Sequence, residues 1–371
     1  MLKFNFMGDV MLGELLENYR RGLRTILEKR GIDPFEHVLP ILAEADLNVI
    51  NLECVFSDSS ILDKPFSGIL ISPESFIRFL SENGINVVNT ANNHALDHGR
   101  GAFERSLKII REKGIEVIGY TENCFFQEEP VVVEIERKRL GLFGYNISNF
   151  PEQDRKRTVD RIKDVIKDSR RSLDTIIVSM HWGEEYTNVP PAYVVESGRE
   201  LLESGCDILH GHHSHHVQGV IKDGNRVFAP SLGNFIFDQM VDRNRITAIL
   251  RVEIDDAGDL DFRCLPCYMN DCYQPVAAPE YAEYLGEITV FLEKCWKEDR
   301  AETFRELVEN SVKKGHQNNR IRMRVRMLAH FWDYLPYVGG MLALRRSKES
   351  IYSVIKSEES LKSISKRDGP D

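Results

Sequence analysis

The stretch LHGHHSHHVQG, residues Leu209–Gly219, places five histidines within seven residues. The apolar run from Cys206 to Leu209 precedes them, so we expect a buried strand that delivers imidazole side chains to a site at its end. His213 and His215 stand at positions i and i+2. In an extended chain they share one face, so both reach one metal cluster. A solvated, tag-like run is the competing interpretation, and it is disfavoured because other strand ends in the chain also carry residues of ligand type.

Length and composition are those of an ordinary globular protein. The 371 residues are 42% hydrophobic and 29% charged, enough for one large domain with an appendage. The net charge of −10 disfavours a nucleic-acid binder, which needs a basic face. Seven cysteines scattered through apolar runs do not resemble a disulfide framework, and the start MLKFNFMGDV lacks the pattern of a signal peptide. No apolar run reaches the ~18–20 residues of a membrane span, so the expected location is the cytoplasm.

Short apolar strands alternate with helical segments in the first half of the chain. Strands are expected at 2–7, 47–52, 85–90 and 175–180, and helices at 14–29, 73–82, 101–113 and 155–171. This alternation predicts an α/β sheet buried on both faces. The pattern becomes meander-like near Val217, which favours a mixed sheet or two stacked sheets flanked by helices. We therefore expect a main domain over 1–276, a helical extension over 277–355 and a disordered tail over 356–371.

Residues of ligand type stand at the ends of several expected strands. They are Asp9, Glu53, Asn93, His181, His213 and His215. The carboxyl ends of parallel strands share one edge of a sheet, so these side chains converge. Two carboxylates, one amide and three imidazoles suit two divalent ions, Zn, Mn or Fe, with one carboxylate bridging. Some of these residues also have an ordinary explanation: Asp9 alone could cap a helix, and His181 alone could be a hydrogen-bonded core residue. Glu53 is harder to explain in this way, because a carboxylate at the edge of a core needs a partner. Their joint occurrence favours the metal site.

Six motifs in this order resemble those of the capsule-synthesis CapA family, also called the poly-γ-glutamate biosynthesis family, whose domain belongs to the calcineurin-like metallophosphatase superfamily. They are Gly8–Gly13, Asn51–Glu53, Asn92–Asp97, His181–Tyr186, Gly211–Gln218 and Ser231–Asp238. The resemblance implies a calcineurin-like α/β/β/α sandwich with a helical C-terminal extension. It also implies a metal-dependent, phosphoesterase-like hydrolase in which the metals activate the attacking water.

The resemblance assigns roles to the ligand-type residues. Asp9 and His215 would hold the first metal, and Glu53 would bridge the two ions. The second metal would be held by Asn93, His181 and His213. His94 would be the catalytic residue that donates a proton to the leaving oxygen or steadies the negative charge of the transition state.

Five further residues are candidates for supporting the ligands or lining the substrate pocket. They are Asp97, Trp182, Glu184, His212 and Asn234. Helix capping is an equal alternative for Asp97, and ordinary packing is an alternative for Trp182. The superfamily's usual Asp-x-His start is here Asp9-Val10-Met11. The first metal either binds weakly for this reason or takes another ligand.

The expected substrate is a small molecule or a polymer, with a phosphoester favoured and an amide of a glutamyl polymer kept as an alternative. A different class of function is a non-catalytic accessory protein of capsule or envelope polymer synthesis that retains the fold. The segment 320–346 is basic at both ends with an apolar, aromatic middle. It is compatible with contact to a membrane surface or a partner protein, and also with packing on its own domain.

Overall fold

The computed structural model describes residues 1–297 except 16, 17, 19, 58–69, 240 and 241, and beyond 297 only residues 310, 313, 317 and 321. The expected tail over 356–371 lies outside the described residues. So do the segment 320–346, apart from Ile321, and most of the expected helical extension over 277–355.

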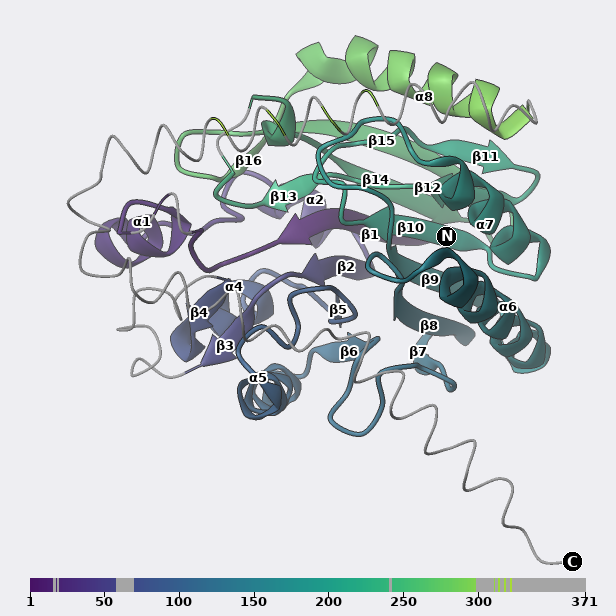
Figure 1. Cartoon of the computed structure of the whole chain (residues 1–371), viewed down its shortest axis with the longest axis horizontal. Coiled ribbons are helices and arrows are strands. Elements are labelled where there is room, and N and C mark those ends of the chain that lie inside the picture. The colour runs from purple at the N-terminus through teal and green to yellow at the C-terminus, as the bar shows by residue number, and fades with distance from the viewer. Residues whose placement is uncertain are drawn as a thin grey trace, which may run out of the picture.

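Two β-sheets form the centre of the molecule (Figure 1). The first has the strand order β16-β15-β14-β1-β2-β5-β6, with β13 paired to β1, and the second has the order β11-β12-β10-β9-β8-β7. The strands of the first sheet are β1 (Leu2–Val10), β2 (Leu47–Leu52), β5 (Val87–Asn89), β6 (Glu116–Ile118), β13 (Asn234–Ile236), β14 (Ile246–Ile254), β15 (Leu260–Met269) and β16 (Pro275–Ala277). Those of the second are β7 (Val131–Ile135), β8 (Lys138–Asn146), β9 (Thr175–His181), β10 (Ile208–His212), β11 (Ile221–Asp223) and β12 (Arg226–Ala229). A separate pair is formed by β3 (Val55–Ser57) and β4 (Ile71–Pro73).

Successive residues along the strands enter different hydrophobic clusters, because side chains alternate between the two faces of a sheet. In β1, Phe4 and Phe6 pack against Ile177 and Ile208 of the second sheet. Met7 and its neighbours on the other face pack beneath the helices. The two sheets are therefore stacked face to face, and each has its outer face covered.

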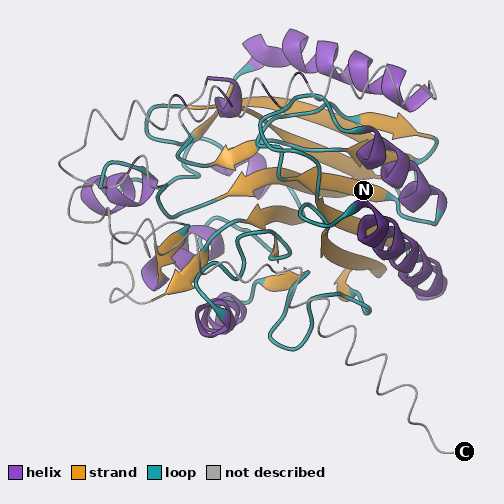
Figure 2. Cartoon of the chain, viewed as in Figure 1, coloured by secondary structure: helices purple, strands orange, loops and turns teal. Residues whose placement is uncertain are grey.

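Helices cover both outer faces, so strands lie between helices (Figure 2). They are α1 (Leu23–Arg30), α2 (Leu39–Ala43), α4 (Arg78–Ser81), α5 (Arg100–Glu112), α6 (Glu152–Ser169), α7 (Ala192–Glu203) and α8 (Ala282–Lys297). Short 3₁₀ turns lie at Glu74–Ile77, Arg170–Ser172, Asp242–Arg245 and Pro279–Tyr281. The expected α/β/β/α sandwich is confirmed, and so is the presence of a C-terminal helix.

Helix α8 packs on the body of the protein. Leu285 and Ile288 on this helix share a cluster with Val217 and Ala248. The boundary between 276 and 277 stays a prediction. Within the described part of the chain, no helix has the length and apolar character needed to cross a membrane.

The parallel strands carry the candidate residues to one edge. β1, β2, β5 and β6 run parallel to one another in the first sheet, as do β8, β9, β10 and β12 in the second. Their carboxyl ends hold Asp9, Glu53, Asn93 and His181. This is the edge at which open α/β sheets place their ligand sites.

Candidate metal centre

Asp9 is held in place by the backbone on both sides of β1. Its amide donates to the carbonyl oxygen of Gly233 at 2.9 Å, and its Cα is in register with Asn51 of β2 and Asn234 of β13. The preceding residue is glycine for a steric reason, because a Cβ at Gly8 would lie 1.9 Å from that same carbonyl oxygen. The carboxylate is therefore fixed by rigid strands and not by a loop.

Three side chains converge in the buried interior near this point. Asp9, Glu53 and His181 each offer one ligand atom, and these atoms all lie within 4.8 Å of one another. The three residues are 0%, 1% and 0% exposed. His181 Nε2 lies 3.5 Å from Glu53 Oε1. Among the described residues, the structure therefore contains a candidate metal-binding triad.

The triad contains buried oxygen atoms without hydrogen bonds. Within the described part of the chain, Asp9 Oδ2 and Glu53 Oε2 are buried and accept none. A buried carboxylate without a compensating partner is costly, and such groups are normally paired or coordinate a metal. Oxygen and imidazole nitrogen are ligands for Zn, Mn and Fe, so the residues fit a divalent ion.

Asn93 joins the triad through His181. Its Oδ1 lies 2.8 Å from His181 Nε2, and its Nδ2 lies 3.1 Å from Nε2 of His94. His94 Nδ1 in turn lies 2.8 Å from Asp97 Oδ2. A carboxylate only accepts, so Nδ1 carries the hydrogen and Nε2 is left to accept from the Asn93 amide. Asp97 therefore orients His94. Helix α5 begins after Gly99, its N-cap residue.

The histidine-rich segment leaves the strand earlier than expected. β10 ends at His212, and the backbone of His213 and His215 has φ of +90° and +58°. The expectation that these two residues share one face of an extended chain is therefore wrong, because they occupy left-handed turn positions. The turn still directs both to the site. The His213 and His181 ring centroids are 4.7 Å apart, and His215 Nδ1 is 3.5 Å from Asp9 Oδ2.

The remaining candidates divide into those that touch the cluster and those that do not. Asn234 Oδ1 accepts from His215 Nδ1 at 2.7 Å, and His212 Nδ1 lies 3.2 Å from Asp9 Oδ1. Trp182 lies in the core, where its indole N–H donates to the Pro230 carbonyl at 3.0 Å. Glu184 is half-buried.

Charge in the metal-free cluster is unevenly distributed. Burial and the neighbouring Asp9 carboxylate raise the pKa of Glu53 well above its ordinary value. Burial also opposes ionisation of Asp9, but the imidazoles of His212 and His215 outweigh it and lower that pKa. Burial lowers the pKa of His181, and it lowers the pKa of His213 to about 4. His181 and His213 are therefore neutral at pH 7, the form that binds metals.

Asn51 belongs to one of the six sequence motifs, and its role becomes visible only in the structure. Its Nδ2 donates to Asp9 Oδ1 at 2.9 Å and to Glu53 Oε1 at 3.2 Å, and Asn89 donates to its Oδ1 at 3.1 Å. One amide thus holds both carboxylates in place. The alternation of β2 was the available signal, because Asn51 is a polar residue within an otherwise apolar strand end.

Glu185 and Tyr186, in the segment that follows His181, also lie at the cluster. Glu185 was given no role, although its charge raises the pKa of Glu53, His213 and His215 and so lies near the cluster. The ring of Tyr186 stacks on His215, with centroids 5.7 Å apart. The segment after β9 therefore forms one wall of the site.

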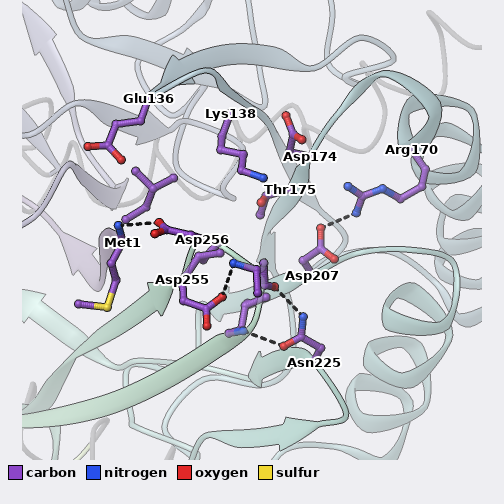
Figure 3. Close-up of a pocket in the computed structure, with 15 residues that line it drawn as sticks. Met1, Glu136, Lys138, Arg170, Asp174, Thr175, Asp207, Asn225, Asp255 and Asp256 are labelled. Carbon is purple, nitrogen blue, oxygen red and sulfur yellow. Dashed lines mark hydrogen bonds and ion pairs between the residues drawn. The ribbon is translucent and has the colours of Figure 1, made fainter.

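A cavity of about 460 Å³ lies at the opposite edge of the sheets (Figure 3). Its lining includes Lys138, Thr175 and Asn225, which stand at or just before the starts of β8, β9 and β12. The close-up also shows Arg170 paired with Asp207. None of the clustered ligand-type residues is among the described residues that line it. The cavity is separate from the candidate metal centre.

The sequence profile of the family described as "Bacterial capsule synthesis protein PGA_cap" matches residues 3–239. The chain belongs to this family. The matched range includes every residue of the cluster, and the PGA_cap family has the metallophosphatase-like fold that the resemblance implied. The expected family and fold class are confirmed.

Curated relatives carry related names. The chain is 28% identical over 288 residues to "Capsule biosynthesis protein CapA" of Bacillus anthracis, covering 73% of this chain and 68% of that protein. It is 25% identical over 303 residues to "PGA biosynthesis protein CapA" of Bacillus subtilis, covering 79% and 77%. A "Probable polyglutamine synthesis accessory protein" of Mycobacterium tuberculosis is 25% identical over 209 residues, covering 50% and 55%.

Proposed function

We propose that this member of the PGA_cap family is a metal-dependent, phosphoesterase-like hydrolase with a dinuclear centre. The observation that carries the proposal is the pair of buried carboxylates, Asp9 and Glu53, which cluster with His181 at the strand ends. Each has one oxygen that accepts no hydrogen bond from a described residue. Such an arrangement is unfavourable without a cation and favourable with one.

We propose that the ligand residues divide between two ions in the way that the family resemblance implies. Asp9 and His215 would hold the first ion, Glu53 would bridge, and Asn93, His181 and His213 would hold the second. Their contacts support this division, because Asn93 and His213 lie against His181 whereas His215 lies against Asp9. When bound, two divalent ions, Mn, Zn or Fe, would supply Lewis acidity and lower the pKa of water.

Two side chains of the protein would position the ligands and protonate the leaving group. Asn51 holds the two carboxylates in one arrangement through its amide. His94 is 20% exposed at the side chain and is oriented by Asp97, so it can reach a substrate that enters beside Asn93. In this proposal the His94 ring is first released from the Asn93 amide, and its Nε2 takes up a proton from water while Nδ1–H stays bonded to Asp97. Nε2 then donates that proton to the leaving oxygen.

The substrate class follows from the centre and the family. A phosphoester is favoured because two adjacent ions suit a phosphoryl group. An amide of a glutamyl polymer is the alternative, because two relatives are named for capsule or PGA biosynthesis.

We further propose a cytoplasmic location without a nucleic-acid partner, supported by seven free cysteines and a net charge of −10. Membrane-surface or protein contact through 320–346 remains a prediction for residues that lie almost wholly outside the described part.

The test compares metal-dependent hydrolysis by wild type and His94→Ala. Wild type should hydrolyse p-nitrophenyl phosphate or a glutamyl polymer when Mn, Zn or Fe is added. His94→Ala should lose a factor of about 10²–10⁴ in kcat while its metal content is unchanged, because His94 donates a proton and binds no ion. Loss of metal from His94→Ala would contradict this role and make His94 a ligand.

The second candidate function is a non-catalytic accessory role in polymer synthesis. The observation that favours it is the name of the Mycobacterium tuberculosis relative, which describes an accessory protein. Full metal occupancy without hydrolysis of a panel of phosphoesters and glutamyl amides would support this role over the hydrolase.

A further inference from the structure

His212 is one of three buried histidines, with His210 and His216, that have no role in the ligand set above, and it is the one paired with a carboxylate of that set. It is 1% exposed and is the last residue of β10, directly opposite His181 of β9 in the sheet register. Its Nδ1 lies 3.2 Å from Asp9 Oδ1, yet this nitrogen makes no hydrogen bond with any described residue. Its other nitrogen, Nε2, lies 3.1 Å from the Ser179 hydroxyl.

These contacts fit a metal ligand when the neutral ring carries its hydrogen on Nε2. A ring whose Nε2–H is taken by a hydroxyl presents the lone pair of Nδ1 on its other side. In that tautomer the lone pair faces a carboxylate oxygen across 3.2 Å, an arrangement that a cation bound by both atoms stabilises. In the other tautomer Nδ1–H faces Asp9 and Nε2 accepts from Ser179. Two ligands of one ion, each about 2.0–2.2 Å from it, lie roughly 3–3.5 Å apart.

The sequence beside Asp9 leaves a position for such a ligand. The start Asp9-Val10-Met11 offers no imidazole from the first sheet. The second sheet supplies one from a strand end, since His212 and His215 approach the two oxygens of Asp9 at 3.2 and 3.5 Å. The distance from His212 matches the spacing of two ligands that share an ion. Nδ1 of His215 donates to Asn234, so its distance shows that this ring lies beside the same carboxylate.

We propose that His212 binds the same metal ion as Asp9 and His215, through Nδ1, with Ser179 orienting its ring. This inference rests on the proposed dinuclear centre and adds a ligand to it. His210 serves as the matched control. It is a fully buried histidine two residues earlier on the same strand, and its ring packs against Phe6 and against the His212 ring itself. The control therefore removes a neighbouring imidazole of the same strand without removing a contact to Asp9.

The first experiment measures metal content by elemental analysis and titration for wild type, His212→Ala and His210→Ala. We expect two ions in wild type and in His210→Ala. His212→Ala should lose one ion, or bind it at least about 100-fold more weakly, and keep the other. Wild-type binding of both ions by a folded His212→Ala variant would overturn the assignment. Absence of metal from wild type would instead overturn the centre itself, so the two failures are distinguishable.

A second experiment gives a positive signal that does not depend on loss of function. A cysteine Sγ at position 212 would stand near the place of Nδ1, and a thiolate bound to Co²⁺ produces a charge-transfer absorption band in the near ultraviolet. We expect this band for His212→Cys loaded with Co²⁺, and not for wild type or His210→Cys. Two bound Co²⁺ ions in His212→Cys without the band would overturn the proposal.

Discussion

At the scale of single residues, Glu53 has the strongest electrostatic reason to bind a cation. Its carboxyl is buried beside Asp9, and the pKa of Glu53 is raised in the metal-free protein. Its Oε1 lies 3.5 Å from His181 Nε2 and accepts from Asn51, whereas its Oε2 accepts no hydrogen bond from a described residue. A bridging position between two ions would relieve the repulsion between the two carboxylates.

We therefore predict that Glu53→Ala releases metal from both positions. Removing a bridging ligand weakens both ions, whereas removing a terminal ligand weakens one. Metal content of the folded variant measures the effect, with Glu116→Ala, an exposed carboxylate on β6, as the control. Retention of both ions by Glu53→Ala would exclude the bridging role.

His215 predicts how metal binding depends on pH. Burial lowers its pKa, but Asp9, Glu53 and Glu185 outweigh burial and raise the pKa of His215 to about 10. The metal-free ring is therefore protonated at pH 7, and a metal binds the deprotonated ring. Binding at pH 7 should release at least one proton, and apparent affinity should rise by up to about tenfold per pH unit between pH 7 and 9.

Isothermal titration in buffers of different ionisation enthalpy measures the protons released. A metal affinity that does not change between pH 7 and 9, with no proton release, would contradict this prediction. It would show that metal binding does not deprotonate His215.

The ligand types could be predicted from sequence, but their exact contacts could not. Asp9, Glu53 and His181 are recognisable because each ends or follows an apolar strand. The positive φ of His213 and His215 was not predictable, because those values are uncommon for residues other than glycine. The proximity of His212 to Asp9 depends on how two sheets stack, which no local pattern encodes.

At the scale of elements, the site depends on close backbone contacts around β1. A Cβ at Gly8 would lie 1.9 Å from the Gly233 carbonyl oxygen, and a Cβ at Gly211 would lie 1.9 Å from that of Pro230. Neither carbonyl belongs to a flexible side chain, so the backbone itself would have to move. These two glycines allow the strands to approach closely enough for their ligands to meet.

Gly8→Ala should lower the free energy of unfolding by about 3 kcal/mol or more, because overpacked backbone cannot relax cheaply. The same substitution at Gly286 in α8 meets no atom within 4 Å. It should raise stability by about 0.5–1 kcal/mol, since alanine favours a helix more than glycine does. Urea denaturation of both variants measures the difference. Equal stabilities would contradict the close contact at Gly8.

Helix α1 shows where an element could not be predicted. Helical spacing indicated a helix over 14–29, but α1 spans only Leu23–Arg30. The buried Glu14 carboxylate accepts from the amides of Arg20 and Gly22 and from the Thr25 hydroxyl. A side chain that binds these backbone amides competes with the helix for them. The apolar residues do recur at helical spacing, but the hydrogen bonds of Glu14 delay the start of the helix to Leu23.

At the scale of the whole molecule, the two stacked sheets bring both carboxyl edges to one place. The alternation of strands and helices predicted the layered α/β architecture, because apolar strands must be covered on both faces. The pairing of β13 with β1, which brings Asn234 to His215, joins segments more than two hundred residues apart. Such long-range pairing follows from packing and not from local sequence.

The most direct test of the proposed centre is the metal content of the wild-type chain. The protein would be purified without a histidine tag or chelator, loaded with Mn, Zn or Fe, and measured by elemental analysis. The buried carboxylates and histidines at the strand ends predict about two ions per chain. A chain that binds no metal under any of these loading conditions would contradict the dinuclear centre.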